Sequence, residues 1–191
     1  ILAGAGSLAF SGSFGGGGVG GSIGISVAVN KTTDSVEAAI DSATVSAAGN
    51  LSLTATEDAD IRALTVGGAV GVSGGGGGAG VGAAGAGSGN TIRNTVLAAI
   101  RNASSVTTTN SGSVSLTATD SSFISANAGG LGIGVAFGGG GAGVSLGVAA
   151  ADNNIQNSVS AYIDNSLVTS AGGVSLSATQ TATIESLSIG G

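Results

Sequence analysis

One pattern occurs three times along this chain, and the repetition limits the folds open to it. Ile1, Ile61, Ile124 and Ile184 occupy equivalent positions, so successive copies begin at nearly constant intervals. Each copy contains, in order, an uncharged glycine-rich stretch, an asparagine, a V-x-A-x-I segment, a turn and a Ser/Thr-rich strand. Such periodicity is typical of arrays in which each unit packs on its neighbours. It divides the chain into repeats at 1–60, 61–123 and 124–183, with 184–191 beginning a further repeat of one continuous solenoid.

The glycine-rich part of each repeat keeps its register without insertions. The first isoleucine of each repeat lies 39 residues before the isoleucine of V-x-A-x-I in all three copies. Asparagine side chains stacked along such an array can hydrogen-bond to one another. We therefore expect a structural ladder of aligned asparagines and isoleucines, made of Asn30, Asn90 and Asn153, of Ile40, Ile100 and Ile163, and of Ile61, Ile124 and Ile184.

The second part of each repeat varies in length and carries a clear strand pattern. It has three more residues in the second repeat, within Asn102–Gly112, which indicates an exposed loop. In the segment that begins at Val114, every second residue is apolar and the residues between are Ser or Thr. This period of two predicts a strand with Val114, Leu116 and Ala118 facing inward and Ser115, Thr117 and Thr119 facing outward.

These features predict an all-β fold, a parallel β-solenoid built from three repeats of about 60 residues. Two arrangements are open. Three coils of about 20 residues per repeat would give an axial repeat of ~14 Å, and one wide coil per repeat would give ~5 Å, because neighbouring strands lie ~4.8 Å apart. We favour about three coils per repeat.

Several strands of the glycine-rich part are apolar on both faces, for example Ile23–Val29 and Gly143–Ala149. A strand of this kind is buried on both sides. We expect that either another sheet of the same chain or a neighbouring molecule covers such a strand. Alternating Gly and Ala would allow the sheets to approach closely.

Composition excludes several classes of function. The chain has ten acidic residues, four basic residues and no His or Cys, so we expect no enzyme activity, no metal site and no cofactor. Scattered cations and few aromatic residues make nucleic-acid binding unexpected. The cluster of Glu57, Asp58 and Asp60 is interpreted as a solvated turn, since its counterparts in the other repeats are not acidic clusters.

Residues 1–30, 63–92 and 121–151 carry no charge, which raises the question of membrane insertion. Their central glycine runs lower both helicity and hydrophobic transfer energy, so we disfavour insertion. No signal peptide is visible at the start of the sequence.

The motif V-x-A-x-I, followed by V-x-A-x-G, an L-x-L-x-A strand, a glycine block and an apolar run ending in Asn, resembles the repeats of giant secreted bacterial surface proteins. The segment Ala43–Ala55 is similar to coils of filamentous-haemagglutinin-type adhesins and leukotoxin-like autotransporters. The resemblance covers all three repeats. It implies a parallel β-helix at the cell surface or outside the cell, used as an adhesive or structural rod, and it implies no catalytic residue.

The sequence thus predicts a structural segment of an extracellular fibre or large surface adhesin, which associates end to end or within a longer array. The alternative is a binding module that presents the Asn102–Gly112 loop or the Ser/Thr face to a cell-surface ligand. A further alternative is an ice-binding face, because Thr54-Ala-Thr56 and Thr117-Ala-Thr119 show the T-x-T spacing of flat solenoids.

Overall fold

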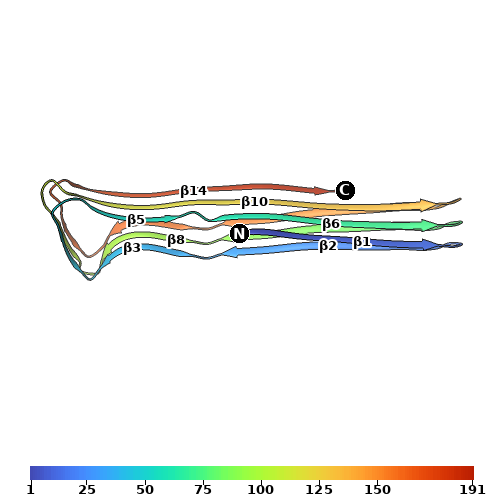
Figure 1. Cartoon of the computed structure of the whole chain (residues 1–191), viewed down its shortest axis with the longest axis horizontal. Helices are drawn as coiled ribbons and strands as arrows, with labels where there is room; N and C mark the ends of the chain where they lie inside the picture. Colours follow the sequence, from blue (N-terminus) through green and yellow to red (C-terminus); the bar gives the residue numbers. More distant parts are fainter.

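A computed structural model describes all 191 residues, which form fourteen β-strands and no helix (Figure 1). Most strands are rich in Val, Ile, Thr, Ala and Ser with period-two alternation, as expected of strands with one face inward. The strands are β1 (Leu2–Phe14), β2 (Val19–Thr32), β3 (Ser35–Asp41), β4 (Thr44–Ala47), β5 (Leu51–Glu57), β6 (Asp60–Gly74), β7 (Ala79–Ile92), β8 (Thr95–Arg101), β9 (Ser105–Thr108), β10 (Ser113–Phe137), β11 (Ala142–Ile155), β12 (Ser158–Ile163), β13 (Leu167–Thr169) and β14 (Gly173–Gly190).

Every strand pairing is parallel and joins one repeat to the next. The largest sheet has the order β1-β6-β10-β14, with β5 also paired to β10, and three further sheets have the orders β11-β7-β2, β12-β8-β3 and β13-β9-β4. Ile61 pairs with Ile124, and Ile124 pairs with Ile184, so each isoleucine lies beside its equivalent in the next repeat. This parallel, in-register pairing is consistent with a β-solenoid.

The preference for about three coils per repeat is wrong. A repeat passes through each of the four sheets once before it meets its successor, so it makes a single wide coil. Local periodicity locates strands but does not say which strands are neighbours, and the length of about 60 residues is compatible with either arrangement. Residues that pair in neighbouring coils are therefore separated by one repeat length along the chain.

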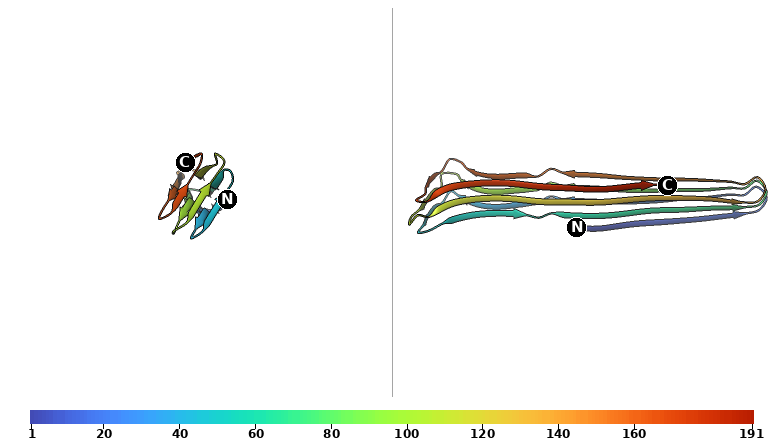
Figure 2. Two further views of the ribbon diagram at one scale, coloured as in Figure 1. Left: turned by 90° about the vertical axis from the view of Figure 1, so that its left-hand side faces the viewer. Right: turned by 90° about the horizontal axis from the view of Figure 1, so that it is seen from above.

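The coils are strongly elongated, and each has two distinct parts (Figures 1 and 2). At one end β1, β6 and the second half of β10 lie against β2, β7 and β11, and glycine turns connect the two layers. We call this two-layered part the wall. At the other end, β5 and the first half of β10 enclose a wider interior together with the sheets β12-β8-β3 and β13-β9-β4. We call this part the body.

The body has a conventional hydrophobic core. Inward residues of the central coil, among them Val96, Ile100 and Leu116, are 0% exposed. They pack against aligned apolar residues of the outer coils, including Ile40 and Ile163. The Ser and Thr residues between them face outward, as the alternation predicts. Burial of these apolar side chains stabilises the stack of coils by the ordinary hydrophobic effect.

The interior of the wall is built from Gly, Ala and Ser, together with Thr65 of β6. A methyl group placed on Gly71 would overlap the carbonyl oxygen of Val81 in the opposite layer, and one on Gly82 would overlap that of Ile133. The two layers therefore approach more closely than the ~10 Å that separates packed sheets with larger side chains. The predicted close approach of the sheets is confirmed.

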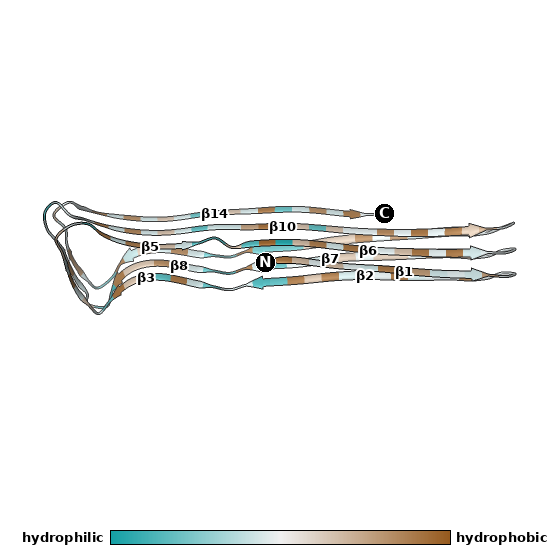
Figure 3. Ribbon diagram, in the orientation of Figure 1, coloured by the Kyte–Doolittle hydropathy of each residue, from teal (hydrophilic) through white to brown (hydrophobic).

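The large apolar residues of the wall point outward. Leu8 and Phe14 on one layer are 81% and 80% exposed, and Ile23 and Val29 on the other are 71% and 77% exposed. Figure 3 shows hydrophobic residues recurring along these strands, with hydrophilic residues gathered where the wall meets the body. One face of each strand is thus covered by the opposite layer of the same chain, and the other is bare.

The turns at the free edge of the wall explain the three glycine blocks. Gly17, Gly77 and Gly140 have φ angles of 78°, 82° and 86°, a left-handed conformation that favours glycine. The turns also stack on one another, because the amide of Gly17 donates to the carbonyl of Gly76 at 3.1 Å. The blocks are structural turns.

Two substitutions in β7 test the close approach of the layers. We expect Gly82→Ala to destabilise the protein by about 1–3 kcal/mol, because the new methyl group would force the layers apart. The matched change Gly87→Ala places its methyl group outward, 3.9 Å from Val27 Cγ2, and should be neutral or stabilising by up to about 1 kcal/mol. Urea unfolding measures both. Equal effects would contradict the packing described.

Candidate functional site

The predicted asparagines form a ladder at the base of the wall. Asn30 Nδ2 donates to Asn90 Oδ1 at 2.8 Å, and Asn90 Nδ2 donates to Asn153 Oδ1 at 2.8 Å. Asn90 is 2% exposed, so these bonds lie in the interior. Each amide has both a donor and an acceptor, and the chain of bonds therefore continues along the stack without an unpaired group in the middle.

A second set of polar contacts lies four residues further on. Asn94 Oδ1 accepts the backbone N–H of Asp34 at 3.0 Å, and Asn157 Oδ1 accepts that of Asn94 at 2.8 Å. Across the interior, Asn94 Nδ2 donates to Glu57 at 3.2 Å and Asn157 Nδ2 donates to Asp120 at 2.8 Å. These amides join coils and also join the two sides of one coil.

The two carboxylates in this region were not recognised as a pair from the sequence. Asp120 is 0% exposed and also accepts the hydroxyl of Ser122 at 2.8 Å. Burial raises the pKa of Glu57, and the negative charges of Asp34, Asp120 and Asp58 raise it further. The alignment of Glu57 with Asp120 in successive repeats was the available signal. The hydrogen bonds of these carboxylates tie the wall to the body, and no cation lies among the groups that bond them.

The isoleucines of the predicted ladder lie in aligned columns. Ile61 and Ile124 are 0% exposed, whereas Ile184 is 46% exposed at the last coil. Ile40 and Ile163 pair with the buried Ile100 from either side. Their side chains serve packing, and none borders a cavity.

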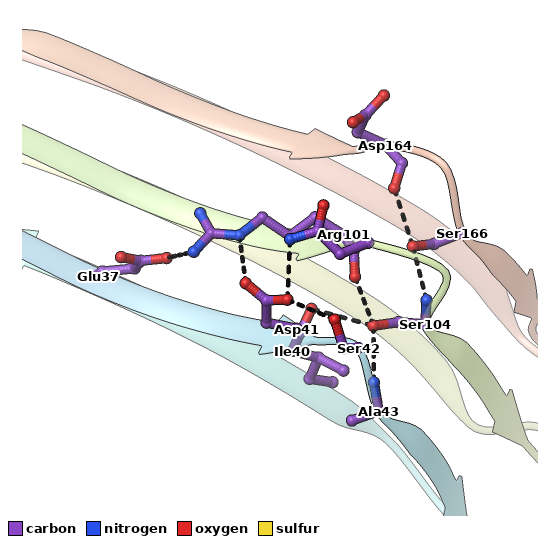
Figure 4. A network of polar contacts seen from close by, with 10 residues as sticks. Glu37, Ile40, Asp41, Ser42, Ala43, Arg101, Ser104, Asp164 and Ser166 are labelled. Atoms are coloured by element: carbon purple, nitrogen blue, oxygen red, sulfur yellow. Dashed lines mark hydrogen bonds and ion pairs between the residues drawn. The ribbon is translucent and has the colours of Figure 1, made fainter.

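A charged network spans two coils at one corner of the body (Figure 4). Arg101 forms ion pairs with Glu37 at 2.7 Å and with Asp41 at 2.8 Å. Hydrogen bonds from Arg101, Asn102 and Ser42 lower the pKa of Asp41 to about 2. This network was not recognised from the sequence, although Asp41 and Arg101 occupy equivalent positions of adjacent repeats and so are aligned in register.

Ser104 adds backbone contacts at the same corner. Its hydroxyl donates to the carbonyl of Arg101 at 2.6 Å and accepts the N–H of Ala43 at 3.2 Å. Its own N–H donates to the hydroxyl of Ser166 in the next coil at 3.2 Å. The shallow hollow beside these residues has a volume of about 400 Å³. It is lined by Leu167 and by five small or polar residues, namely Ala103, Ser104, Ser105, Asn165 and Ser166.

The three-residue insertion of the second repeat is divided between two turns. Register places one extra residue between Arg101 and Ser105, because Asp41 pairs with Arg101 whereas Thr44 pairs with Ser105. The other two lie between Thr108 and Val114. Four residues in these turns have positive φ angles, which allows the backbone to bulge without disturbing the strands on either side; they are Asn102, Ala103, Asn110 and Ser111.

The outward hydroxyls of the body form a regular grid. With one coil per repeat, Thr54, Thr117 and Ser177 lie in adjacent rungs. Rungs are ~4.8 Å apart and alternate residues along a strand ~6.6 Å apart. The grid has three columns, Ser52/Ser115/Ser175, Thr54/Thr117/Ser177 and Thr56/Thr119/Thr179.

The structure contains no helix that is long and apolar enough to cross a membrane. It brings no three metal-ligating side chains together in a group that could hold an ion. Four surfaces of this chain could meet a partner, namely the open ends of the stack, the hydroxyl grid, the loops of the second repeat and the outer faces of the wall. No family model, curated protein or solved structure matches the chain.

Substitution of the central asparagine tests the ladder. Asn90→Ala removes two amide hydrogen bonds and leaves the amides of Asn30 and Asn153 without these partners, so we expect a loss of about 2–4 kcal/mol, from about 1–3 kcal/mol per unsatisfied buried group. Asn30→Ala at the first coil removes one bond from a half-buried site and should lose less than half as much. Chemical unfolding compares them, and similar losses would show that the ladder does not act as a unit.

The lowered pKa of Asp41 predicts a pH dependence of stability. A carboxylate whose pKa falls from 3.8 to about 2 on folding stabilises the protein above pH 3.8 and loses this effect as the pH falls towards 2. The difference in melting temperature between the natural chain and Asp41→Asn should therefore shrink over that range. Because the site is exposed, the difference should be small and should also shrink in high salt. A difference that does not change with pH would contradict the role of the ion pair.

Proposed function

We propose that this chain is a segment of a parallel β-solenoid rod whose role is mechanical, within an extracellular fibre or a large surface adhesin. Continuous parallel ladders run through all the sheets, and the asparagine and isoleucine columns run with them. In such a stack each added coil extends the same hydrogen-bonded ladders and the same core. Rigidity along the axis follows from this continuity.

The observation that carries the proposal is the in-register pairing of equivalent residues from one coil to the next, which lets each coil cover the core of its neighbour. In the last coil, Val174, Leu176 and Ile184 are 46%, 44% and 46% exposed. Their counterparts one coil earlier, Val114, Leu116 and Ile124, are each 0% exposed. The outer edges of β1 and β14 also leave backbone donors and acceptors without strand partners. A further coil would cover these side chains and pair these edges, whether it comes from more of the same chain or from another copy.

The extracellular or cell-surface location rests on the resemblance to repeats of filamentous-haemagglutinin-type adhesins. The segment that carries the resemblance, Ala43–Ala55, lies in β4, β5 and the turns beside them. The function proposed is attachment or coating through a rigid rod, and no residue is assigned a catalytic role.

A tandem chain tests the array. Residues 1–183 followed directly by a complete second copy would keep the natural period, since Ile1 of the second copy takes the place of Ile184. We expect one uninterrupted rod that is longer along the stacking axis by three coils, or ~14 Å, and that melts at a higher temperature than a single copy because the open core at the junction is covered. Electron microscopy and calorimetry measure both properties.

The matched control for this experiment carries six Gly/Ser residues at the junction, which disturb the register of the next coil. It should give two bodies that melt like the single copy. If the in-register tandem also behaves as two separate bodies, the chain is not a segment of a continuous solenoid and the proposal fails.

The hydroxyl grid supports a second candidate, an ice-binding face. The structure places its Ser and Thr columns in adjacent rungs, so the hydroxyls form a contiguous array. Thermal hysteresis of the folded chain tests this candidate, with Thr117→Lys in the centre of the grid as the variant that should abolish the effect. Absence of thermal hysteresis would exclude it.

The two turns of the second repeat support the binding-module alternative in one respect, since they alone carry the insertion. Deletion of Ala103 and of Asn110–Ser111 would restore the length of the first repeat. Binding of the natural chain to a glycan array, lost in this variant while its circular dichroism is unchanged, would favour a binding role over a purely mechanical one.

A further inference from the structure

The wall exposes apolar side chains on both of its outer faces. On the face formed by β1, β6 and β10, Leu8, Val66 and Leu131 are 81%, 49% and 57% exposed. On the face formed by β2, β7 and β11, Ile25 and Leu146 are 66% and 60% exposed. No charged residue occurs within residues 1–30, 63–92 or 121–151, which contain most of both faces. The charges that directly flank these ranges are Lys31, Arg62, Arg93, Asp120 and Asp152, and they mark the base of the wall.

The exposed area is large for a chain of this size. Thirteen-residue strands are ~43 Å long and three rungs span ~14 Å, so each face has a flat area of ~600 Å². The largest apolar patch on a typical monomer is about 300–600 Å², and larger patches mark interaction sites. This chain has two such faces, back to back. Each face reaches the upper end of that range, and patches of this size are often functional.

Both faces are corrugated. Large side chains on one rung lie beside glycines on the next, since a methyl group on Gly68 would lie 3.0 Å from Leu8 Cδ1 and the ring of Phe14 lies over Gly74. On the opposite face, Gly85 and Gly87 of β7 lie beside Ile25 and Val27 of β2. Ridges and gaps thus alternate from rung to rung. Side chains of another sheet can interdigitate with such a surface, as they do between the sheets of a sandwich.

The relief of the faces argues for a protein partner and against a lipid one. Corrugation provides fixed complementarity that fluid lipid chains do not need, whereas the side chains of a second sheet can fit into it.

We propose that a second copy of this chain covers the wall, with the walls of two molecules packed face to face. Such contact would cover ~600 Å² on each copy, or ~1,200 Å² in total, by the strand dimensions above, which is the lower end of the range for stable interfaces. Charges lie only at the base of the two faces, at Lys31, Arg62, Asp152 and Glu185, and most of the formal net charge of −6 lies in the remainder of the molecule, where it opposes the contact weakly. Because both faces are apolar, each wall can bind a neighbour on either side, and the association runs sideways, across the stacking axis of the proposed rod.

Charged substitutions on the two faces test this inference. Leu8→Glu with Leu131→Glu places two carboxylates on one face, and Ile25→Glu with Val27→Glu places two on the other. The control, Ser115→Glu with Thr117→Glu, adds the same charge to the outward surface of the body. All these side chains point outward, and circular dichroism and melting temperature establish that each variant folds.

Sedimentation velocity and electron microscopy give the readout. The natural chain and the control should form assemblies that widen across the stacking axis with increasing concentration. Variants with one charged face should stop at pairs, and a variant with both faces charged should show at least a tenfold weaker association. The charged substitutions should not change the length of the assemblies along the stacking axis, which is the property that the tandem experiment measures. Failure of the sideways association is therefore distinguishable from failure of the proposed rod.

Two results would overturn the inference. The first is a natural chain that shows no sideways association at concentrations up to about 1 mM, where even a weak interface associates. The second is flotation of the natural chain with phosphatidylcholine vesicles, lost in the wall variants, without any self-association. That outcome would assign the faces to lipid instead.

Discussion

The close contact between the two layers of the wall determines the arrangement of the remaining features. Where Gly71 and Gly82 meet the carbonyl oxygens of the opposite layer, there is no room for a β-carbon. The interior therefore holds small residues, namely Gly, Ala and Ser with the single larger residue Thr65, and the large hydrophobic residues of these strands face outward. The wall consequently has a thin, uniform interior and two apolar surfaces. The body has the opposite arrangement, with Val, Ile and Leu inside and Ser and Thr outside.

The asparagines lie where one arrangement changes into the other. Inward positions of the central coil change from Ala86 and Ser88 to Asn90 and then to the buried Ile92. Separation of the layers leaves space that is too wide for alanine, and the breaks between β2 and β3 and between β7 and β8 leave the backbone N–H groups of Asp34 and Asn94 without strand partners. The side chains of Asn94 and Asn157 accept these N–H groups and donate across the interior to Glu57 and Asp120. The columns of asparagine amides therefore allow a single coil to include both the narrow wall and the wider body.

Much of this was predictable from residues at aligned positions. The period placed Asn30 beside Asn90 and Ile61 beside Ile124, and period-two alternation gave the inward and outward faces of β10. The number of coils per repeat was not predictable in this way, because alternation describes a strand and not its neighbour. The exposed wall was missed for a related reason. Large and small residues alternate around Ile23 as regularly as apolar and polar residues alternate around Leu116. The distance to the opposite layer decides whether the large residue of such a strand faces outward, as Ile23 does, or inward, as Leu116 does.

The same long period has a consequence for how the molecule acquires its structure. Every strand pairs with a partner one full repeat away along the chain, and no two neighbouring strands form a hairpin. A large loop must close before the first ladder bond forms, at a cost in chain entropy that no local contact offsets, and such topologies fold slowly. Once two coils have paired, however, each later coil finds a complete template for its strands. Formation of the first pair of coils is thus the slow step, and growth proceeds from it one coil at a time.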